Sequence, residues 1–147
     1  KCLKIIPNQI LNSVDITTMP FPGFPTDLQA PFMALMTTAK GISKIKETVF
    51  ENRMHHVKEL NRMGAKICLK DNIATITGVE NLHGSAVVGV DLRATAALAL
   101  AGLSAKGKTI IQGLDHLERG YENFASKLTL IGAEIINRRK KINLYKL

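Results

Sequence analysis

Two short stretches of the chain carry side chains that suit acid–base chemistry on an anionic small molecule. Asp27 stands at the expected N-terminus of one helix, and Arg53 stands where a strand ends and the next helix is expected to begin. A second set of this kind follows, with Asp91, Arg93 and then Arg119. Guanidinium groups bind phosphate and carboxylate oxygens two at a time, and a nearby carboxylate can act as a base or hold their orientation. The residue types therefore predict a site for an anionic small ligand where helix N-termini meet.

The two aspartates also have a simpler interpretation, which the sequence leaves open. An Asp at the first position of a helix can accept hydrogen bonds from backbone N–H groups, and such an N-cap contributes about 1 kcal/mol. The arginines have no such explanation. A cation at a helix N-terminus opposes the helix dipole, so Arg53 and Arg119 favour a bound anion over a purely structural role.

The elements that must position these residues follow from apolar periodicity and from Gly and Pro. Threefold spacing of apolar residues before a glycine is typical of helices, whereas alternation is typical of strands. We expect helices over residues 28–40, 53–63, 91–103 and 120–131. Strands are expected over residues 14–19, 42–49, 65–70, 73–77, 86–90, 108–114, 133–137 and 142–145. Asp71-Asn72 suits a tight turn between two of these strands.

The order of these elements, β-α-β-α-β-β, occurs twice. The motif Asp-Leu-Gln-Ala at 27–30 returns as Asp-Leu-Arg-Ala at 91–94, and Met-Gly-Ala at 63–65 returns as Ile-Gly-Ala at 131–133. We place a leading segment at 1–13, a first repeat at 14–82 and a second repeat at 83–147. One such unit cannot cover both faces of its sheet, so the copies should pack their helices in a shared core with the sheets outward.

The number of repeats bears on how much of a domain the chain holds. An open array of this kind needs about three copies, and the chain carries two. It also starts at Lys1 rather than Met. The sequence therefore predicts an α/β (α+β) fold that begins at the cut edge of a larger domain.

Composition narrows the class of protein. The 147 residues are 46% hydrophobic, enough for one domain with its own core, and no stretch approaches the ~18 to 20 apolar residues of a membrane helix. Cys2 and Cys68 match no metal or redox spacing, so we expect no metal, no cofactor and the reduced thiols of a cytoplasmic protein. The net charge of +8 suggests nucleic acid as a partner, but the basic residues are spread out without interleaved aromatics, which disfavours it.

Four longer motifs resemble the UDP-N-acetylglucosamine enolpyruvyl transferases, also called 1-carboxyvinyltransferases. They are Phe-Pro-Thr-Asp-Leu-Gln-Ala at 24–30, Glu-Thr-Val-Phe-Glu-Asn-Arg at 47–53, Asp-Leu-Arg-Ala at 91–94 and Arg-Gly-Tyr-Glu at 119–122. The resemblance runs from about Val14 to Ile135 and suggests the C-terminal portion of such an enzyme. It implies inside-out α/β barrels of three repeats, with the active site in the cleft between two domains.

The reaction of this family belongs to peptidoglycan precursor synthesis. It adds the 3-hydroxyl of UDP-N-acetylglucosamine to C2 of phosphoenolpyruvate, passes through a tetrahedral intermediate and eliminates phosphate. By resemblance, Asp27 takes the hydroxyl proton and Asp91 supports the cation cluster. The cations that the resemblance places around the phosphate and carboxylate of phosphoenolpyruvate are Arg53, Arg93 and Arg119.

The resemblance also implies a nucleotide-sugar side to the site, with a backbone contact from Val49 and packing by Phe50. The family's mobile loop with a proton-donating cysteine has no counterpart, since neither Cys2 nor Cys68 lies in a matching context. We therefore expect the missing N-terminal part of the same enzyme as a partner. For this chain alone we expect no turnover and at best weak binding of the UDP-sugar.

Two alternatives of other classes stay open. The chain could be a catalytically inactive fragment or half of a split enzyme that acts as an interaction module, and stable co-purification with an upstream fragment would support this. It could instead be a basic nucleic-acid-binding domain, for which a salt-dependent mobility shift at moderate ionic strength is the minimum requirement.

Overall fold

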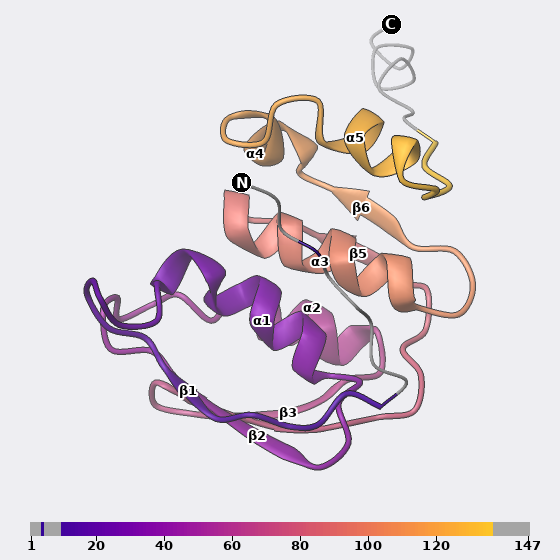
Figure 1. The fold of residues 1–147 in the computed structure, drawn as a ribbon. Helices are drawn as coiled ribbons and strands as arrows, with labels where there is room; N and C mark the ends of the chain where they lie inside the picture. Colours follow the sequence, from indigo (N-terminus) through magenta and orange to yellow (C-terminus); the bar gives the residue numbers. More distant parts are fainter. Residues whose placement is uncertain (1–3, 5–9, 137–147) are drawn as a thin grey trace, which may run out of the picture.

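A four-stranded sheet, a layer of helices and a pair of strands lie over one another in the computed structural model, which describes residue 4 and residues 10–136 (Figure 1). The first part of the chain forms β1 (Ile16–Thr17), the 3-10 helix η1 (Thr26–Leu28), α1 (Gln29–Met36), β2 (Ile42–Lys46), α2 (His56–Arg62), β3 (Lys66–Lys70) and β4 (Ile73–Thr77). The second part forms β5 (Ala86–Val88), α3 (Leu92–Ser104), β6 (Ile110–Gln112), α4 (Leu114–Glu118) and α5 (Phe124–Leu130).

The first repeat has the predicted order β-α-β-α-β-β. Its strands form one sheet in the order β1-β2-β4-β3, in which β1 runs parallel to β2 and the other neighbours are antiparallel. The predicted turn at Asp71-Asn72 is confirmed, because Lys70 pairs with Ile73 across it and Asp71 adopts a left-handed φ of 54°. An Asp tolerates this conformation better than most residues do.

The second repeat starts in the same way and then departs from the prediction. β5 pairs with β6 in parallel, and α3 connects them. The helix expected over 120–131 forms only as α5, and the sequence did not predict α4, which precedes it. Asn123, at the start of α5, has a left-handed φ of 52°, which a continuous right-handed helix excludes. Residues 133–136 form no strand, and the remaining expected strand residues, 137 and 142–145, lie outside the described residues.

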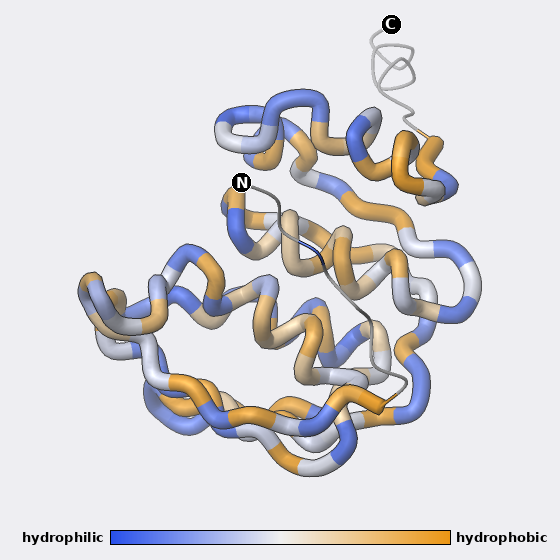
Figure 2. The backbone as a smooth tube through the Cα atoms, in the orientation of Figure 1, coloured by the Kyte–Doolittle hydropathy of each residue, from blue (hydrophilic) through white to orange (hydrophobic). Residues whose placement is uncertain are grey.

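A core shared by helices of both repeats holds the layers together, as the repeat pattern predicts. Helices α1 and α2 cover one face of the β1–β4 sheet, and α3 lies between α1 and β6 (Figure 1). Along β2 and β4 buried residues alternate with more exposed ones, so one face of the sheet is buried and the other is exposed. Hydrophobic residues (orange in Figure 2) are interspersed with hydrophilic ones along these strands. The fully buried side chains include Met33, Met36, Ile45, Leu60, Met63, Ile76 and Leu98.

Small residues let α1 and α3 pack closely. Ala30 and Ala34 on α1 and Ala94, Ala97 and Ala101 on α3 are all buried. The distance between packed helices depends on the side chains at their contact, and alanine permits a short one. The alanine-rich stretch of the second repeat is therefore a core helix, whose N-terminus is brought next to η1 and α1.

Two helix bounds differ from the prediction. The helix expected over 28–40 ends at Met36, where the Thr37 hydroxyl donates to the Ala34 carbonyl at 2.6 Å. The helix expected over 53–63 begins only at His56. Arg53 therefore lies in the loop before α2, not in its first turn. This removes the conflict between a cation and the helix dipole that the sequence implied.

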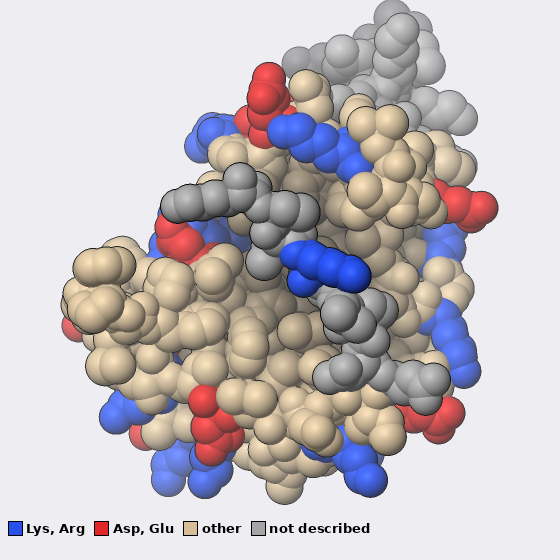
Figure 3. All heavy atoms as spheres, in the orientation of Figure 1, with Lys and Arg blue, Asp and Glu red and all other residues tan. Residues whose placement is uncertain are grey.

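Charged side chains are dispersed on the face of the molecule that Figure 3 shows, with Lys and Arg interspersed with Asp and Glu. No helix among the described residues has the length and apolar character needed to span a bilayer. Within the same residues, no group of three or more His, Cys, Asp and Glu side chains could hold a metal ion.

Gly78→Ala is expected to destabilise the fold by about 3 kcal/mol, because Gly78, which follows β4, lies directly against the backbone of Ala39 in the segment after α1. A Cβ at residue 78 would stand 1.6 Å from the Ala39 carbonyl oxygen. The backbone around it is held by hydrogen bonds, including one from the Gly78 N–H to the Gly41 carbonyl at 3.0 Å. Urea unfolding measures the loss.

Gly107→Ala is the matched control for this substitution. Gly107 has a φ of 89° and nothing within 4 Å of an added Cβ, so only its backbone preference is lost, at about 1 kcal/mol. Equal losses in the two variants would contradict the close approach at Gly78.

Candidate active site

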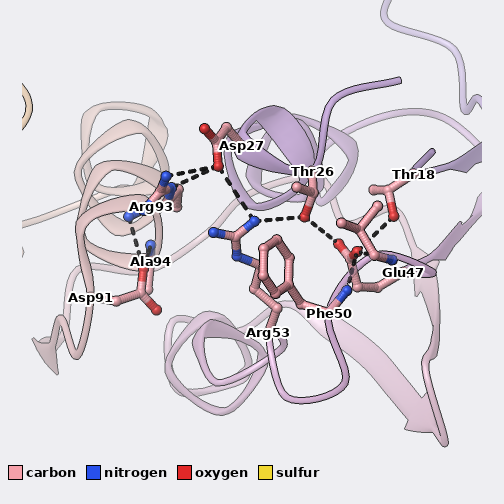
Figure 4. A network of polar contacts seen from close by, with 10 residues as sticks. Thr18, Thr26, Asp27, Glu47, Phe50, Arg53, Asp91, Arg93 and Ala94 are labelled. Carbon is pink, nitrogen blue, oxygen red and sulfur yellow. Dashed lines mark hydrogen bonds and ion pairs between the residues drawn. The ribbon is translucent and has the colours of Figure 1, made fainter. Parts of the chain in front are cut away.

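The carboxylate of Asp27 lies between two arginines that come from different repeats (Figure 4). Asp27 belongs to η1, at the mouth of α1, and Arg93 belongs to the first turn of α3. Arg93 donates to Asp27 Oδ1 from Nε at 2.9 Å and also approaches it with Nη2 at 2.9 Å. Arg53 Nη1 lies 3.4 Å from the same oxygen. The packing of α1 against α3 thus brings together three residues that the sequence predicted for one site.

Arg53 reaches this carboxylate from the loop between β2 and α2. Its guanidinium carbon lies 4.2 Å from the centre of the Phe50 ring, and its Nη1 donates to the Thr26 hydroxyl at 2.8 Å. Its side chain is 19% exposed. An arginine that is stacked on an aromatic ring and hydrogen-bonded loses little further freedom when it binds an anion.

One oxygen of Asp27 remains available. Both arginines contact Oδ1, and among the described residues no donor lies on Oδ2. The Asp27 side chain is 59% exposed, so solvent or a ligand can reach it. The arrangement can therefore accept a hydroxyl proton on Oδ2 while the arginines hold Oδ1.

The arginines keep this carboxylate ionised. The hydrogen bond from Arg93 is the largest cause that lowers the pKa of Asp27, partial burial opposes it, and the charges of Arg93 and Arg53 lower it further. The pKa of Arg93 is raised in turn, mainly by the same hydrogen bond to Asp27. Both groups are therefore charged at neutral pH, and the free site is an ion cluster that a stronger anion could enter.

Asp91 has the simpler of the two roles that the sequence left open. Its Oδ1 accepts from the backbone N–H groups of Arg93 at 2.8 Å and Ala94 at 2.9 Å, so it is the N-cap of α3. The extended backbone of Asp91 lets its side chain turn back onto the helix. The N-cap interpretation is wrong for Asp27, which makes no such bond because it lies inside a 3-10 turn and points toward the arginines.

A pocket of about 840 Å³ opens beside the cluster, between the β2–α2 loop and the start of α3. Four of the predicted site residues line it, namely Phe50, Arg53, Asp91 and Arg93. The rest of the lining was not among the predicted site residues and consists of Glu51, Asn52, His55, Lys58, Glu59, Val88 and Val90. Val49 lies next to the pocket in the loop and is exposed.

Arg119 is not brought into the cluster. It follows the last residue of α4 instead of beginning a helix, and its exposed side chain makes no hydrogen bond or ion pair with another described residue. The turn that carries it nevertheless packs at the start of α3, where a Cβ on Gly120 would meet Leu92 at 2.6 Å. Arg119 therefore lies near the same end of α3 as Arg93.

His56 is a buried residue beside the site that sequence analysis missed. It is 1% exposed, and neither ring nitrogen has a hydrogen-bond partner among the described residues. Burial lowers the pKa of His56 to about 4, although the charge of Asp91 acts in the opposite direction. The apolar stripe of α2 was the only available signal, since His56 precedes the buried Val57 and Leu60 on it.

The depressed pKa of His56 makes stability depend on pH. The unfolded chain takes up the proton near pH 6.5 and the folded chain only near 4, so stability is complete above 6.5 and is lost as the pH falls toward 4. From pH 7.5 to pH 5 the free energy of unfolding is therefore expected to fall by about 2 kcal/mol. Urea unfolding at the two pH values measures it, and His56→Gln should flatten the dependence. The exposed neighbour provides the control: if His55→Gln flattens it equally, burial of His56 is not the cause.

The layered fold is of the enolpyruvyl transferase type, as comparison with solved structures shows. The enolpyruvyl transferase NikO from Streptomyces tendae superposes with a TM-score of 0.81 at 31% identity, over 87% of this chain and 30% of that one. An EPSP synthase from Acinetobacter baumannii gives a TM-score of 0.58 at 21% identity over 78% of this chain, a likeness of fold alone.

The chain belongs to the EPSP synthase (3-phosphoshikimate 1-carboxyvinyltransferase) family, whose sequence profile matches residues 4–128. Its relatives include UDP-N-acetylglucosamine 1-carboxyvinyltransferase 2 of Prochlorococcus marinus, 65% identical over 133 residues, and UDP-N-acetylglucosamine 1-carboxyvinyltransferase of Trichormus variabilis, 57% identical over 140 residues. The chain spans 31% of the length of each relative. The predicted resemblance and fold class are confirmed, although the described residues do not form a complete barrel.

Proposed function

We propose that this chain forms part of a UDP-N-acetylglucosamine 1-carboxyvinyltransferase, which transfers the enolpyruvyl group of phosphoenolpyruvate to the sugar 3-hydroxyl and releases phosphate. The observation that carries the proposal is Asp27, with one oxygen held by two arginines and the other available. The names of relatives at 57% and 65% identity supply the substrates. The reaction needs a base for a hydroxyl and cations for a phosphate and a carboxylate, and this cluster offers both.

In the first step the 3-hydroxyl donates its hydrogen bond to Asp27 Oδ2. Its oxygen then forms a bond to C2 of phosphoenolpyruvate as the proton passes to Asp27, while C3 gains a proton from a group outside this chain. A carboxylate with a lowered pKa is a weak base, so its environment must change during the reaction. Phosphoenolpyruvate draws Arg53 and Arg93 toward its own anionic groups, which raises the pKa of Asp27 when the proton is transferred.

In the second step a base outside this chain takes a proton from C3 of the tetrahedral adduct. The electrons of that C–H bond form the C2–C3 double bond, and phosphate leaves C2 with the electrons of the C–O bond and takes the proton back from Asp27. Arg53 and Arg93 stabilise the negative charge on the departing phosphate. Arg119 is proposed as a third cation, because the turn that carries it packs at the end of α3 that also carries Arg93. Asp91 supports the cluster by capping α3, which holds the backbone of Arg93 in place.

Val49 and Phe50 are proposed to hold the nucleotide sugar. Both side chains are exposed at the loop before α2, where Phe50 also lines the pocket beside Arg53. The Val49 carbonyl is the proposed backbone contact, and the Phe50 ring packs near the sugar.

The test combines the native polypeptide that carries this chain with phosphoenolpyruvate and UDP-N-acetylglucosamine. We expect phosphate release together with a product whose mass is that of the enolpyruvyl ether of the UDP-sugar. Shikimate 3-phosphate, the acceptor that the family name suggests, is the matched control and should give no release. Release with shikimate 3-phosphate alone would contradict the proposed acceptor, and release with neither would contradict the transferase function.

The isolated chain of 147 residues is expected to release no phosphate above a blank without protein. It spans 31% of the length of its relatives, and the proton that C3 must gain comes from a group outside it. At best it binds the UDP-sugar weakly. A colorimetric phosphate assay at high chain concentration checks this, and steady turnover by the isolated chain would show that it holds every catalytic group.

A further inference from the structure

Glu47 is a buried acid, and three of its four side-chain partners lie at the site, namely Thr26, Val49 and Phe50. It follows the last residue of β2 and is 1% exposed. Its Oε1 accepts from the Thr18 hydroxyl at 2.7 Å and from the backbone N–H groups of Val49 at 2.9 Å and Phe50 at 3.2 Å. Its Oε2 accepts from the Thr26 hydroxyl at 2.8 Å. No cation among the described residues contacts it directly.

Thr26 connects this carboxylate to Arg53. A hydroxyl has one hydrogen, which Thr26 donates to Glu47, so its oxygen is left to accept from Arg53 Nη1 at 2.8 Å. The three groups form a polarised chain from guanidinium to hydroxyl to carboxylate, in which each hydrogen bond strengthens the next. Glu47 is thereby the indirect counter-ion of Arg53. Apart from those on Nη1, the N–H groups of Arg53 contact no acceptor among the described residues, so they can face an anion.

The same carboxylate also fixes the surface on which Arg53 rests. The N–H groups that it holds belong to Val49 and Phe50, and the Phe50 ring lies under the guanidinium at 4.2 Å. Thr26 in turn directly precedes Asp27 in the chain. One side chain therefore restrains the base, the arginine and the loop before α2, as Figure 4 shows.

The charge of Glu47 fits this role. Burial raises the pKa of Glu47, but the hydrogen bonds from Thr18, Val49, Thr26 and Phe50 together outweigh that effect and lower it. The carboxylate is ionised at neutral pH, and it holds its donors with charge-assisted bonds, which are roughly twice as strong as neutral ones.

We propose that Glu47 is a positioning residue of this site, which orients Arg53 through the Thr26 hydroxyl and fixes the Val49–Phe50 backbone for the nucleotide sugar. The proposal rests on the proposed function, since it assigns Glu47 to the transferase reaction. It touches neither substrate.

The test uses three variants of the native polypeptide. Thr26→Val removes the hydroxyl and nearly conserves the shape, Thr26→Ser retains the hydroxyl, and Glu47→Gln cannot accept from Thr26 on its amide nitrogen. Because small displacements of a binding group cost up to 10²-fold, we expect Thr26→Val and Glu47→Gln to lower kcat/KM for phosphoenolpyruvate by about 30-fold. Thr26→Ser should stay within about threefold of the wild type, since it keeps the donor and acceptor.

A variant with a comparable structural loss separates positioning from stability. Asn61→Ala removes two hydrogen bonds of 2.9 Å that join the end of α2 to Ile67, remote from the cluster. The positioning role is wrong if Asn61→Ala lowers kcat/KM for phosphoenolpyruvate as much as Thr26→Val does. It is also wrong if Thr26→Ser lowers kcat/KM as much as Thr26→Val does.

Amide hydrogen exchange tests, without any substrate, whether Glu47 restrains the Val49–Phe50 backbone. Glu47→Gln replaces charge-assisted bonds by neutral ones, so exchange at Val49 and Phe50 should rise about fivefold, whereas Asn61→Ala should leave it unchanged. Unchanged exchange in Glu47→Gln would overturn the proposal. A wild type without turnover would contradict the proposed function alone, because the exchange rates test the restraint independently.

Discussion

Asp27→Asn is expected to lower kcat of the native polypeptide by about 10³-fold with little change in KM for UDP-N-acetylglucosamine. The amide keeps the size of the side chain, but the atom that replaces Oδ2 cannot take the hydroxyl proton. It also removes the negative charge that Arg53 and Arg93 share in the free site, so phosphoenolpyruvate should bind at least as tightly as before. Steady-state kinetics with each substrate varied in turn measure the separate effects.

Asp15→Asn is the control for this loss. Asp15 is an exposed carboxylate at the sheet edge, where Oδ1 accepts from the Lys44 N–H at 2.6 Å, away from the arginines. It should keep kcat within about twofold of the wild type, as surface substitutions usually do. A variant Asp27→Asn that keeps kcat and raises KM for the UDP-sugar would show that Asp27 only binds substrate.

Arg93→Gln is expected to lower kcat/KM for phosphoenolpyruvate by about 10²-fold and to move the acid limb of the pH profile to higher pH. Arg93 supplies the largest cause of the lowered pKa of Asp27, so its removal lets that pKa rise toward its usual range. The base form of Asp27 exists only above its pKa. In the variant, activity is therefore lost at a higher pH as the pH falls.

Two other arginine substitutions give this prediction its controls. Arg93→Lys keeps the charge but loses the planar guanidinium that donates two hydrogen bonds at once. It should show much of the loss in kcat/KM and little displacement of the acid limb of the pH profile. Arg62→Gln removes an exposed arginine that pairs with Glu59 at 3.4 Å near the far end of α2, and it should change neither quantity. An unaltered acid limb in Arg93→Gln would contradict the coupling between Arg93 and Asp27.

The two aspartates show how far residue types and spacing could predict the site. Asp27 and Asp91 stand in matching motifs, Asp-Leu-Gln-Ala and Asp-Leu-Arg-Ala, and the sequence allowed one capping role for both. Only Asp91 has the extended backbone that returns its side chain to the helix. The preceding Pro25 and Thr26 lead Asp27 into a 3-10 turn instead, and this local difference does not follow from apolar periodicity.

The arginines illustrate the converse. Their types predicted that three arginines converge on an anionic ligand. Two of them, Arg53 and Arg93, lie against the Asp27 carboxylate, and the binding of a ligand by them stays a prediction. Their positions at helix starts were wrong for Arg53 and Arg119, since helix bounds depend on backbone angles at residues such as Asn123. The sequence did hold a signal for Glu47, which directly follows β2. It continues the alternation of the strand as a charged residue at the position where Ser43 and Ile45 are buried.

The most direct test of the account is the structure of the native polypeptide with UDP-N-acetylglucosamine bound, in which the distance from the sugar 3-hydroxyl oxygen to Asp27 Oδ2 is measured. We predict about 3 Å, the range of a hydrogen bond through which the proton can pass. A 3-hydroxyl that points away from Asp27 and toward another proton acceptor would contradict the assignment of Asp27 as the base.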